Sequence, residues 1–143
     1  MKLREVSMVA SDCDGTAALL ARLLNCEVSE AVECPEPPVQ SRFASLRCGP
    51  ASLAVMESTA PGSPIDRFLG ARGEGLFSIT FEVDDIDAAM THFRECGAEF
   101  VCDEPVRLTD YSTGFDTYRE CLVNFTHPQS TARILIELQE LRK

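Results

Sequence analysis

The sequence predicts an α+β fold in which two βαβββ repeats form a curved eight-stranded cup with the helices outside. An alternating strand followed by a capped helix occurs near Glu5 and again near Ser78, and three strand-like segments follow each helix. Neither repeat has enough strands to bury a sheet face alone, so the two sheets are expected to combine. This organisation predicts one domain, 1–143, with repeat one about 1–57, a connection over 58–75 and repeat two over 76–143.

The first repeat opens with residues 5–12, which alternate apolar and polar as a half-buried strand does. Asp12 or Asp14 is placed to cap the helix that follows. Its apolar stripe comprises Ala17, Leu20, Ala21 and Leu24, with Leu23 beside it. Three strand-like segments come next, at about 26–32, 41–48 and 52–57. Gly49-Pro50 supplies the turn before the last of them.

The connection contains a short helix that opens at Ser63-Pro64. The second repeat then alternates over 78–85, and Asp84 or Asp85 is placed to cap a helix that Gly97 ends. The apolar stripe of this helix comprises Ile86, Ala89, Met90 and Phe93. The strand-like segments that follow it lie at about 99–103, 119–125 and 133–139.

Composition and charge narrow the function classes. Apolar residues make up 45% of the chain and charged residues 25%, which is ordinary for a globular protein. The net charge of −10 argues against nucleic-acid binding, because phosphates repel such a surface. No apolar run approaches the ~20 residues needed to cross a membrane, and no signal peptide is evident, so we expect a cytoplasmic protein.

The cysteines and arginines each allow two interpretations. Seven cysteines occur without any CxxC pair, which favours small buried hydrophobes over a disulfide framework or a zinc site, with room for one exposed reactive thiol. Four arginines in the middle of the chain would either form a basic patch for an anionic ligand or be ordinary solvated surface residues. They are Arg42, Arg47, Arg67 and Arg72.

Several stretches resemble the vicinal-oxygen-chelate (glyoxalase/bleomycin-resistance/dioxygenase) superfamily, and within it the methylmalonyl-CoA epimerases. The matching stretches are Ser63 to Gly70, Gly73 to Ile86, Asp103 to Pro105, Asn124 to Ser130 and Ile134 to Leu138. The resemblance covers nearly the whole chain. It implies a cup that holds a divalent metal through four side chains, two from each repeat, and an acid–base pair of glutamates that acts beside a thioester carbonyl.

The metal positions implied by the resemblance are largely altered here. They correspond to Glu5, Ala54, Ser78 and Glu137, of which only Glu137 keeps the family residue. Zinc, cobalt and nickel prefer imidazole or thiolate ligands, so a tightly bound transition metal is not expected. Two carboxylates with waters would hold magnesium or calcium weakly at most. We therefore expect no resident cofactor beyond a weak divalent cation.

The expected site is a pair of carboxylates, Glu5 and Glu137, that face one another with catalytic roles. Two like charges in one cavity would raise one apparent pKa toward neutrality. The expected ligand-binding neighbours are Ser7, Ala54, Ser78, Arg42 and His127. His127 precedes a proline, so turn structure explains it equally well, and His92 is expected to face solvent because it lies off its helix stripe.

Three hypotheses follow. The first is a metal-poor member of the fold that binds a small anionic or acyl-thioester-like molecule, either with acid–base chemistry or as a simple binder. The second is a divalent-metal epimerase with altered ligands. The third is a non-catalytic drug-binding or interaction protein, in which the long segment 106–118 acts as a lid or a protein contact. The repeats are expected to close within one chain or in a homodimer.

Overall fold

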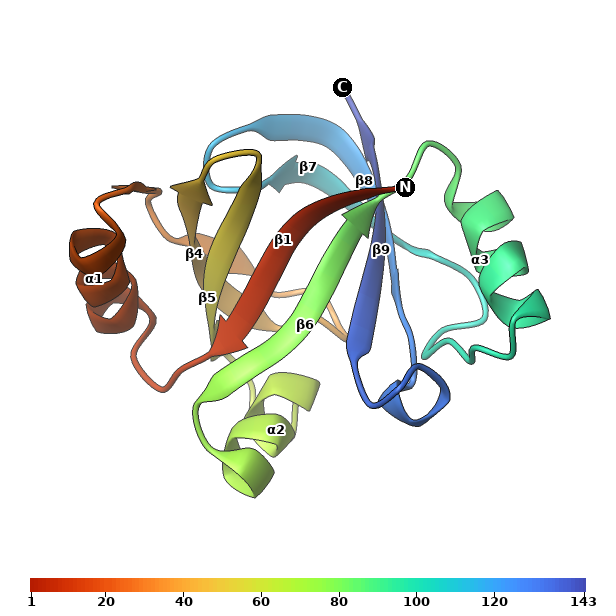
Figure 1. Cartoon of the computed structure of the whole chain (residues 1–143), viewed down its shortest axis with the longest axis horizontal. Helices are drawn as coiled ribbons and strands as arrows, with labels where there is room; N and C mark the ends of the chain where they lie inside the picture. Colours follow the sequence, from red (N-terminus) through yellow and green to blue (C-terminus); the bar gives the residue numbers. More distant parts are fainter. The chain divides into compact units, whose positions relative to one another are not determined.

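The structure is a computed structural model that describes all residues, 1–143. The chain runs through these elements: β1 (Lys2–Val9), α1 (Cys13–Leu24), β2 (Glu27–Val28), β3 (Val32–Cys34), β4 (Ser41–Cys48), β5 (Ala51–Ser58), α2 (Pro64–Arg72), β6 (Gly75–Glu82), α3 (Ile86–Glu95), β7 (Val106–Ser112), β8 (Thr117–Phe125), the 3₁₀ turn η1 (Pro128–Ser130) and β9 (Leu135–Arg142). The predicted α+β class is confirmed (Figure 1). No helix is long and apolar enough to span a membrane.

Two compact units make up the chain. The N-terminal unit contains Glu5–Phe77 and Ser112–Asp116, and the C-terminal unit contains Met1–Arg4, Ser78–Tyr111 and Thr117–Lys143. Each unit is described by itself below. The prediction that 1–143 forms a single domain stays a prediction.

The N-terminal unit has the strand order β2-β4-β5-β1, with β3 also paired to β4. The first predicted strand after α1 is therefore split into β2 and β3 rather than continuous over 26–32. Helix α1 packs on β4 and β5 (Figure 1). The core between them consists of Ala10, Cys13, Ala17, Ala44, Leu46 and Val55.

Helix α1 begins at Asp12, whose Oδ1 accepts a hydrogen bond from the Gly15 N–H at 3.0 Å. Of the two capping candidates, Asp12 is thus the one that caps. Ala17, Leu20 and Ala21 of the predicted stripe pack in or against the core, but Leu24 is 52% exposed and does not join it. The physical reason is that the helix ends at the left-handed residue Asn25, immediately after Leu24.

The C-terminal unit has the strand order β6-β9-β8-β7, and α3 packs against β9 (Figure 1). The core between them consists of Val83, Ile86, Met90, Leu122 and Leu138. Gly97 follows α3 with φ +92°, as predicted for the residue that ends this helix.

Two predictions for the segments that follow α3 are wrong. The segment 99–103 forms only an isolated bridge, Phe100 with Thr126, because the Asn124 side chain rather than a neighbouring strand binds the backbone of Cys102. The segment 106–118, expected to be a long loop, is mostly the β7–β8 hairpin. Its turn closes through the Thr113 N–H, which donates to the Asp116 carbonyl at 2.9 Å.

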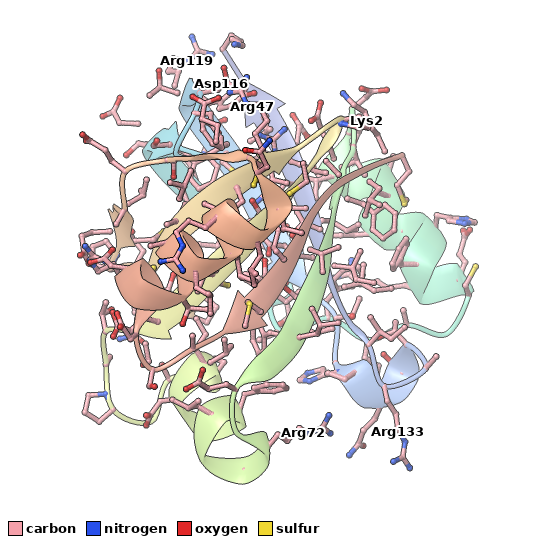
Figure 2. All side chains as sticks on the ribbon, turned by 60° about the vertical axis from the view of Figure 1, so that its left-hand side comes forward. Lys2, Arg47, Arg72, Asp116, Arg119 and Arg133 are labelled. Atoms are coloured by element: carbon pink, nitrogen blue, oxygen red, sulfur yellow. The ribbon has the colours of Figure 1, made fainter.

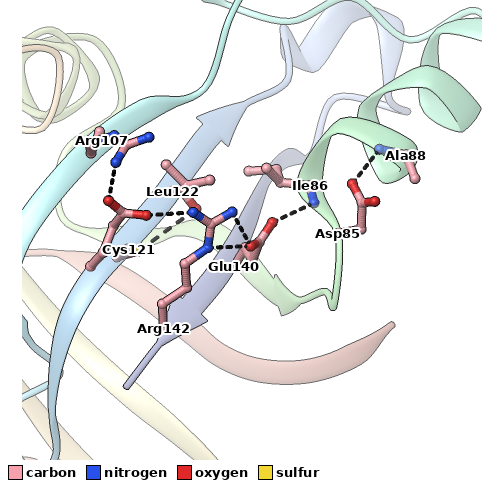
Figure 3. A network of polar contacts seen from close by, with 9 residues as sticks. Asp85, Ile86, Ala88, Arg107, Cys121, Leu122, Glu140 and Arg142 are labelled. Carbon is pink, nitrogen blue, oxygen red and sulfur yellow. Dashed lines mark hydrogen bonds and ion pairs between the residues drawn. The ribbon is translucent and has the colours of Figure 1, made fainter.

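A polar network fixes the start of α3 on β9 (Figure 3). Glu140 Oε2 accepts from the Ile86 N–H at 3.0 Å, and Glu140 Oε1 accepts from Arg142 Nε at 2.6 Å. Arg142 Nη1 also donates to the nearly buried carboxylate of Glu120 at 2.7 Å, and Arg107 contacts the other oxygen of that carboxylate. The buried acid is therefore paired with two arginines, which offsets its desolvation.

The capping bond of α3 gives a stability prediction. Asp85 Oδ1 accepts from the Ala88 N–H at 2.9 Å, so Asp85→Ala should lower the free energy of unfolding by about 1 kcal/mol, measured by urea denaturation. The matched control is Asp84→Ala, because Asp84 is the other predicted candidate and does not cap α3; it should change the value by less than about 0.5 kcal/mol. Equal losses in both variants would contradict this assignment.

Candidate functional site

The N-terminal unit brings together three predicted site residues on the face of its sheet opposite α1. Side chains alternate along a strand, and Met8 and Ala10 pack with α1, so Glu5 and Ser7 lie on the other face. Ala54 is the strand partner of both Ser7 and Ser45, which places it on that same face. Ser7, Ser45 and Ala54 are all buried.

Hydrogen bonds hold the Glu5 carboxylate on this face. Ser45 Oγ donates to Glu5 Oε2 at 3.3 Å, and Ser7 Oγ lies 3.5 Å from Glu5 Oε1. Ser45 was not among the predicted ligand-binding residues. The alternation within 41–48 was the signal that could have found it, because Ala44 and Leu46 are the apolar residues on either side.

Arg42 is not part of this group. Arg42 and Ser45 are three residues apart on β4, so their side chains point to opposite faces of the sheet. Arg42 Nη1 pairs with Asp14 at 2.8 Å, and Arg42 Nε pairs with Glu33 at 3.1 Å. Its predicted ligand-binding role therefore has no support from its position, which is beside α1.

The other mid-chain arginines also have local partners. Arg47 pairs with Glu27 at 3.9 Å and stacks on Phe115 at 4.3 Å from the ring centroid, and Arg67 donates to the Gly62 carbonyl. Arg72 extends outward from the end of α2 (Figure 2). These separate contacts favour the surface interpretation of the four arginines over a single anion-binding patch.

The C-terminal unit places Glu137 at the centre of a hydrogen-bonded group on the face opposite α3. Phe81, Ile136 and Leu138 pack with α3, so Thr80 and Glu137, which are partners in the parallel β6–β9 pair, face the other way. Thr80 Oγ1 donates to Glu137 Oε2 at 3.2 Å. Gln139 Nε2 donates to Glu137 Oε1 at 2.6 Å and to the Tyr111 hydroxyl at 3.2 Å.

Three buried polar atoms have no hydrogen-bond partner, and all three lie on these two faces. They are Ser41 Oγ in the N-terminal unit, and Ser78 Oγ and Gln139 Oε1 in the C-terminal unit. A buried polar atom without a partner costs roughly 1–3 kcal/mol, and such atoms call for an explanation such as a catalytic role or a bound water or ion. Ser78 and Gln139 flank Glu137 on its own face, which makes this face the better candidate for ligand binding.

The family model of the Glyoxalase/Bleomycin resistance protein/Dioxygenase superfamily matches residues 5–115. The chain belongs to this superfamily.

Relatives within the superfamily cover almost the whole chain. The mitochondrial methylmalonyl-CoA epimerase of Homo sapiens is 28% identical over 140 residues, which cover 97% of this chain and 73% of that protein. The ethylmalonyl-CoA/methylmalonyl-CoA epimerase of Cereibacter sphaeroides is 26% identical and covers 98% of each chain. The fold matches a variant of Streptomyces coelicolor methylmalonyl-CoA epimerase in complex with 2-nitronate-propionyl-CoA, with a TM-score of 0.82, 25% identity, and coverage of 100% of this chain and 99% of that one.

The residues that the sequence resemblance assigns to the metal positions do not fit a tightly held transition metal. Ala54 offers a buried methyl group, and Ser78 offers a hydroxyl, neither of which replaces an imidazole ligand. Each of the four carboxylate oxygens of Glu5 and Glu137 already accepts a hydrogen bond from a side chain of the protein. Neither unit holds a group of three or more His, Cys, Asp or Glu side chains placed for a metal ion.

The two histidines lie away from these groups. His127 is exposed and caps η1 through its backbone, where its carbonyl accepts from the Ser130 N–H and hydroxyl. These contacts support the turn interpretation of His127. His92 is exposed, as expected, and lines a surface pocket of about 210 Å³ at the end of α3 together with Cys96, but that pocket contains none of the predicted site residues.

The partnerless hydroxyl of Ser78 gives a second prediction. Ser78→Ala should leave the free energy of unfolding of the ligand-free protein unchanged, or raise it by up to about 1 kcal/mol, because it removes a buried group with no partner. The matched variant Thr80→Val removes a hydrogen bond to a carboxylate and should lower the free energy of unfolding by roughly 1.5–3 kcal/mol. Urea denaturation measures both, and a loss above about 1 kcal/mol in Ser78→Ala would show that its hydroxyl is bonded.

Proposed function

We propose that the chain binds a small acyl thioester of the CoA class on the face of the C-terminal unit opposite α3, and that Glu137 exchanges the proton on the carbon beside the thioester carbonyl. The observation that carries the proposal is the arrangement of Glu137 between two buried polar atoms, Ser78 Oγ and Gln139 Oε1, that have no partner in the protein. The substrate class comes from the relatives, which are methylmalonyl-CoA epimerases by name.

Glu137 suits the role of the acid–base group. It is partly exposed, so a ligand can reach it, while its neighbours Thr80 and Gln139 are buried. Their two hydrogen bonds fix the carboxylate in one orientation, which lowers the entropic cost of aligning it with a bound substrate. A positioned carboxylate contributes typically 10²–10⁴-fold to the rate of such a proton transfer.

Loss of the proton builds negative charge on the thioester oxygen, and that charge needs a hydrogen-bond donor. The Ser78 hydroxyl lies on the same face of the sheet as Glu137 and has no hydrogen-bond partner in the protein. We therefore assign it as the donor to this oxygen. Removing one such donor costs roughly 10²–10³-fold in other enzymes. Gln139 Oε1 would accept a hydrogen bond from an N–H or O–H group of the ligand.

Glu5 is the proposed second carboxylate of the acid–base pair with Glu137, and Ser7 is its neighbour. That Glu5 and Glu137 share one pocket stays a prediction, because the two residues belong to different units. Whether a weak divalent cation assists is also a proposal to be tested, in which Glu5 and Glu137 are the candidate oxygen ligands.

A second candidate function is binding of an acyl thioester without turnover. The observation that favours it is the burial of Ala54, a methyl side chain at a position that the sequence resemblance assigns to a metal ligand. In that case the same face would bind the ligand, and no proton exchange would be seen.

Proton–deuterium exchange on methylmalonyl-CoA in D₂O tests the proposal. The EDTA-treated protein should exchange the proton, and Glu137→Gln should lower the rate by about 10²-fold or more, while the control Glu95→Gln on the exposed surface of α3 leaves it unchanged. NMR follows the loss of the proton signal, and calorimetry follows binding.

The other outcomes are distinct. Binding without exchange in every condition would favour the second candidate function. Exchange only after addition of Co²⁺ or Mg²⁺ would favour a metal-dependent epimerase. Neither binding nor exchange would reject the site.

A further inference from the structure

Cys26 and Cys48 lie at the edge of the N-terminal unit, where Cys26 immediately precedes β2 and Cys48 ends β4. Strands β2 and β4 are antiparallel, with Val28 opposite Leu46 and Glu27 opposite Arg47. One further step in this register brings Cys26 opposite Cys48. Residues directly opposite in an antiparallel pair have Cα atoms about 4.5–5.5 Å apart. A disulfide bond needs Cα atoms about 4.4–6.8 Å apart, and the spacing expected from this register lies within that range.

The two side chains also point to the same face. Ala44 and Leu46 on β4 belong to the core beneath α1, and Cys48 is in phase with them. Cys26 packs against that same core. Both thiols therefore lie on the α1 side of the sheet, as a bond between them requires.

The Cys26 and Cys48 thiols interact with each other, which agrees with this placement. Burial raises the pKa of the Cys26 thiol, and a hydrogen bond with the Cys48 thiol raises it further. Both cysteines are free, and Cys48 is exposed whereas Cys26 is only partly so. A reagent in solution therefore meets Cys48 first.

We propose that Cys26 and Cys48 form a dithiol modification site that takes up a disulfide bond by exchange with a low-molecular-weight disulfide. The Cys48 thiolate attacks one sulfur of the small disulfide, whose S–S bond breaks and releases one small thiol. The Cys26 thiolate then attacks the Cys48 sulfur, which forms the Cys26–Cys48 bond and releases the second small thiol. The two protein thiols are oxidised by two electrons, the small disulfide is reduced by two, and the two protons leave with the small thiols.

The bond would join the end of α1 to the β4–β5 turn. Cys26 lies two residues after the last residue of α1, and its N–H donates to the Ala21 carbonyl of that helix at 3.1 Å. Cys48 precedes the turn at Gly49. Closing this loop restricts the unfolded chain, so the oxidised protein should be the more stable form. For a chain of this size the expected rise in Tm is roughly 5–10 °C.

The test is titration of the full-length protein with oxidised glutathione at pH 8, followed by peptide mapping and a thermal melt. The expected product is a peptide pair linked through Cys26 and Cys48, with the raised Tm, and dithiothreitol should reverse both. Cys26→Ser should stop at a mixed disulfide on Cys48, and Cys48→Ser should give no linked pair. The matched control is Cys96→Ser, which replaces an exposed cysteine at the end of α3 and should leave the linkage intact.

Two outcomes would contradict the Cys26–Cys48 disulfide. Circular dichroism identifies the variants that fold. Mixed disulfides on Cys48 and Cys96 at similar rates, with no Cys26–Cys48 linkage in folded protein, would overturn the proposal. Linkage between Cys48 and any other cysteine would do the same.

Discussion

The parallel pairing of β6 with β9 is the constraint on which the proposed site depends. It sets Thr80 opposite Glu137 and Phe81 opposite Leu138, so one face of the pair is polar and the other apolar. The apolar face is covered by α3, which is held at its start by Glu140. A slip of one residue would turn Glu137 into the core and expose Leu138. Burial of the α3 core therefore also determines which face presents the carboxylate.

The sheet of the N-terminal unit likewise has one apolar face covered by a helix and one polar face, built from different residues. Its apolar face packs on α1, and its other face holds Glu5 between Ser7 and Ser45. In both units the polar face retains buried atoms without a partner, which an ordinary core would exclude. Buried polar atoms without a partner lower the stability of the fold, and such a loss is expected where function requires those atoms. That expectation links the unsatisfied atoms to ligand binding rather than to poor packing.

The fold could be predicted from the sequence because alternation, capping residues and glycine stops are local features. Asp84 and Asp85 both stand before the same helix, so the cap could not be assigned to one of them. A strand was predicted at 99–103 instead of 106–112, because strand pairing partners are not visible in one sequence. Glu137 was found from the family resemblance, but its donor Thr80 was missed, since it contacts Glu137 only through the β6–β9 register.

The central claim is that an acyl thioester binds on the face of the C-terminal unit opposite α3. NMR titration of the labelled protein with propionyl-CoA tests it most directly. We expect the largest chemical-shift changes on the backbone amides of Ser78, Thr80 and Glu137 and on the side-chain amide of Gln139. Shifts confined to the residues around His92, or no shifts at saturating ligand, would contradict it.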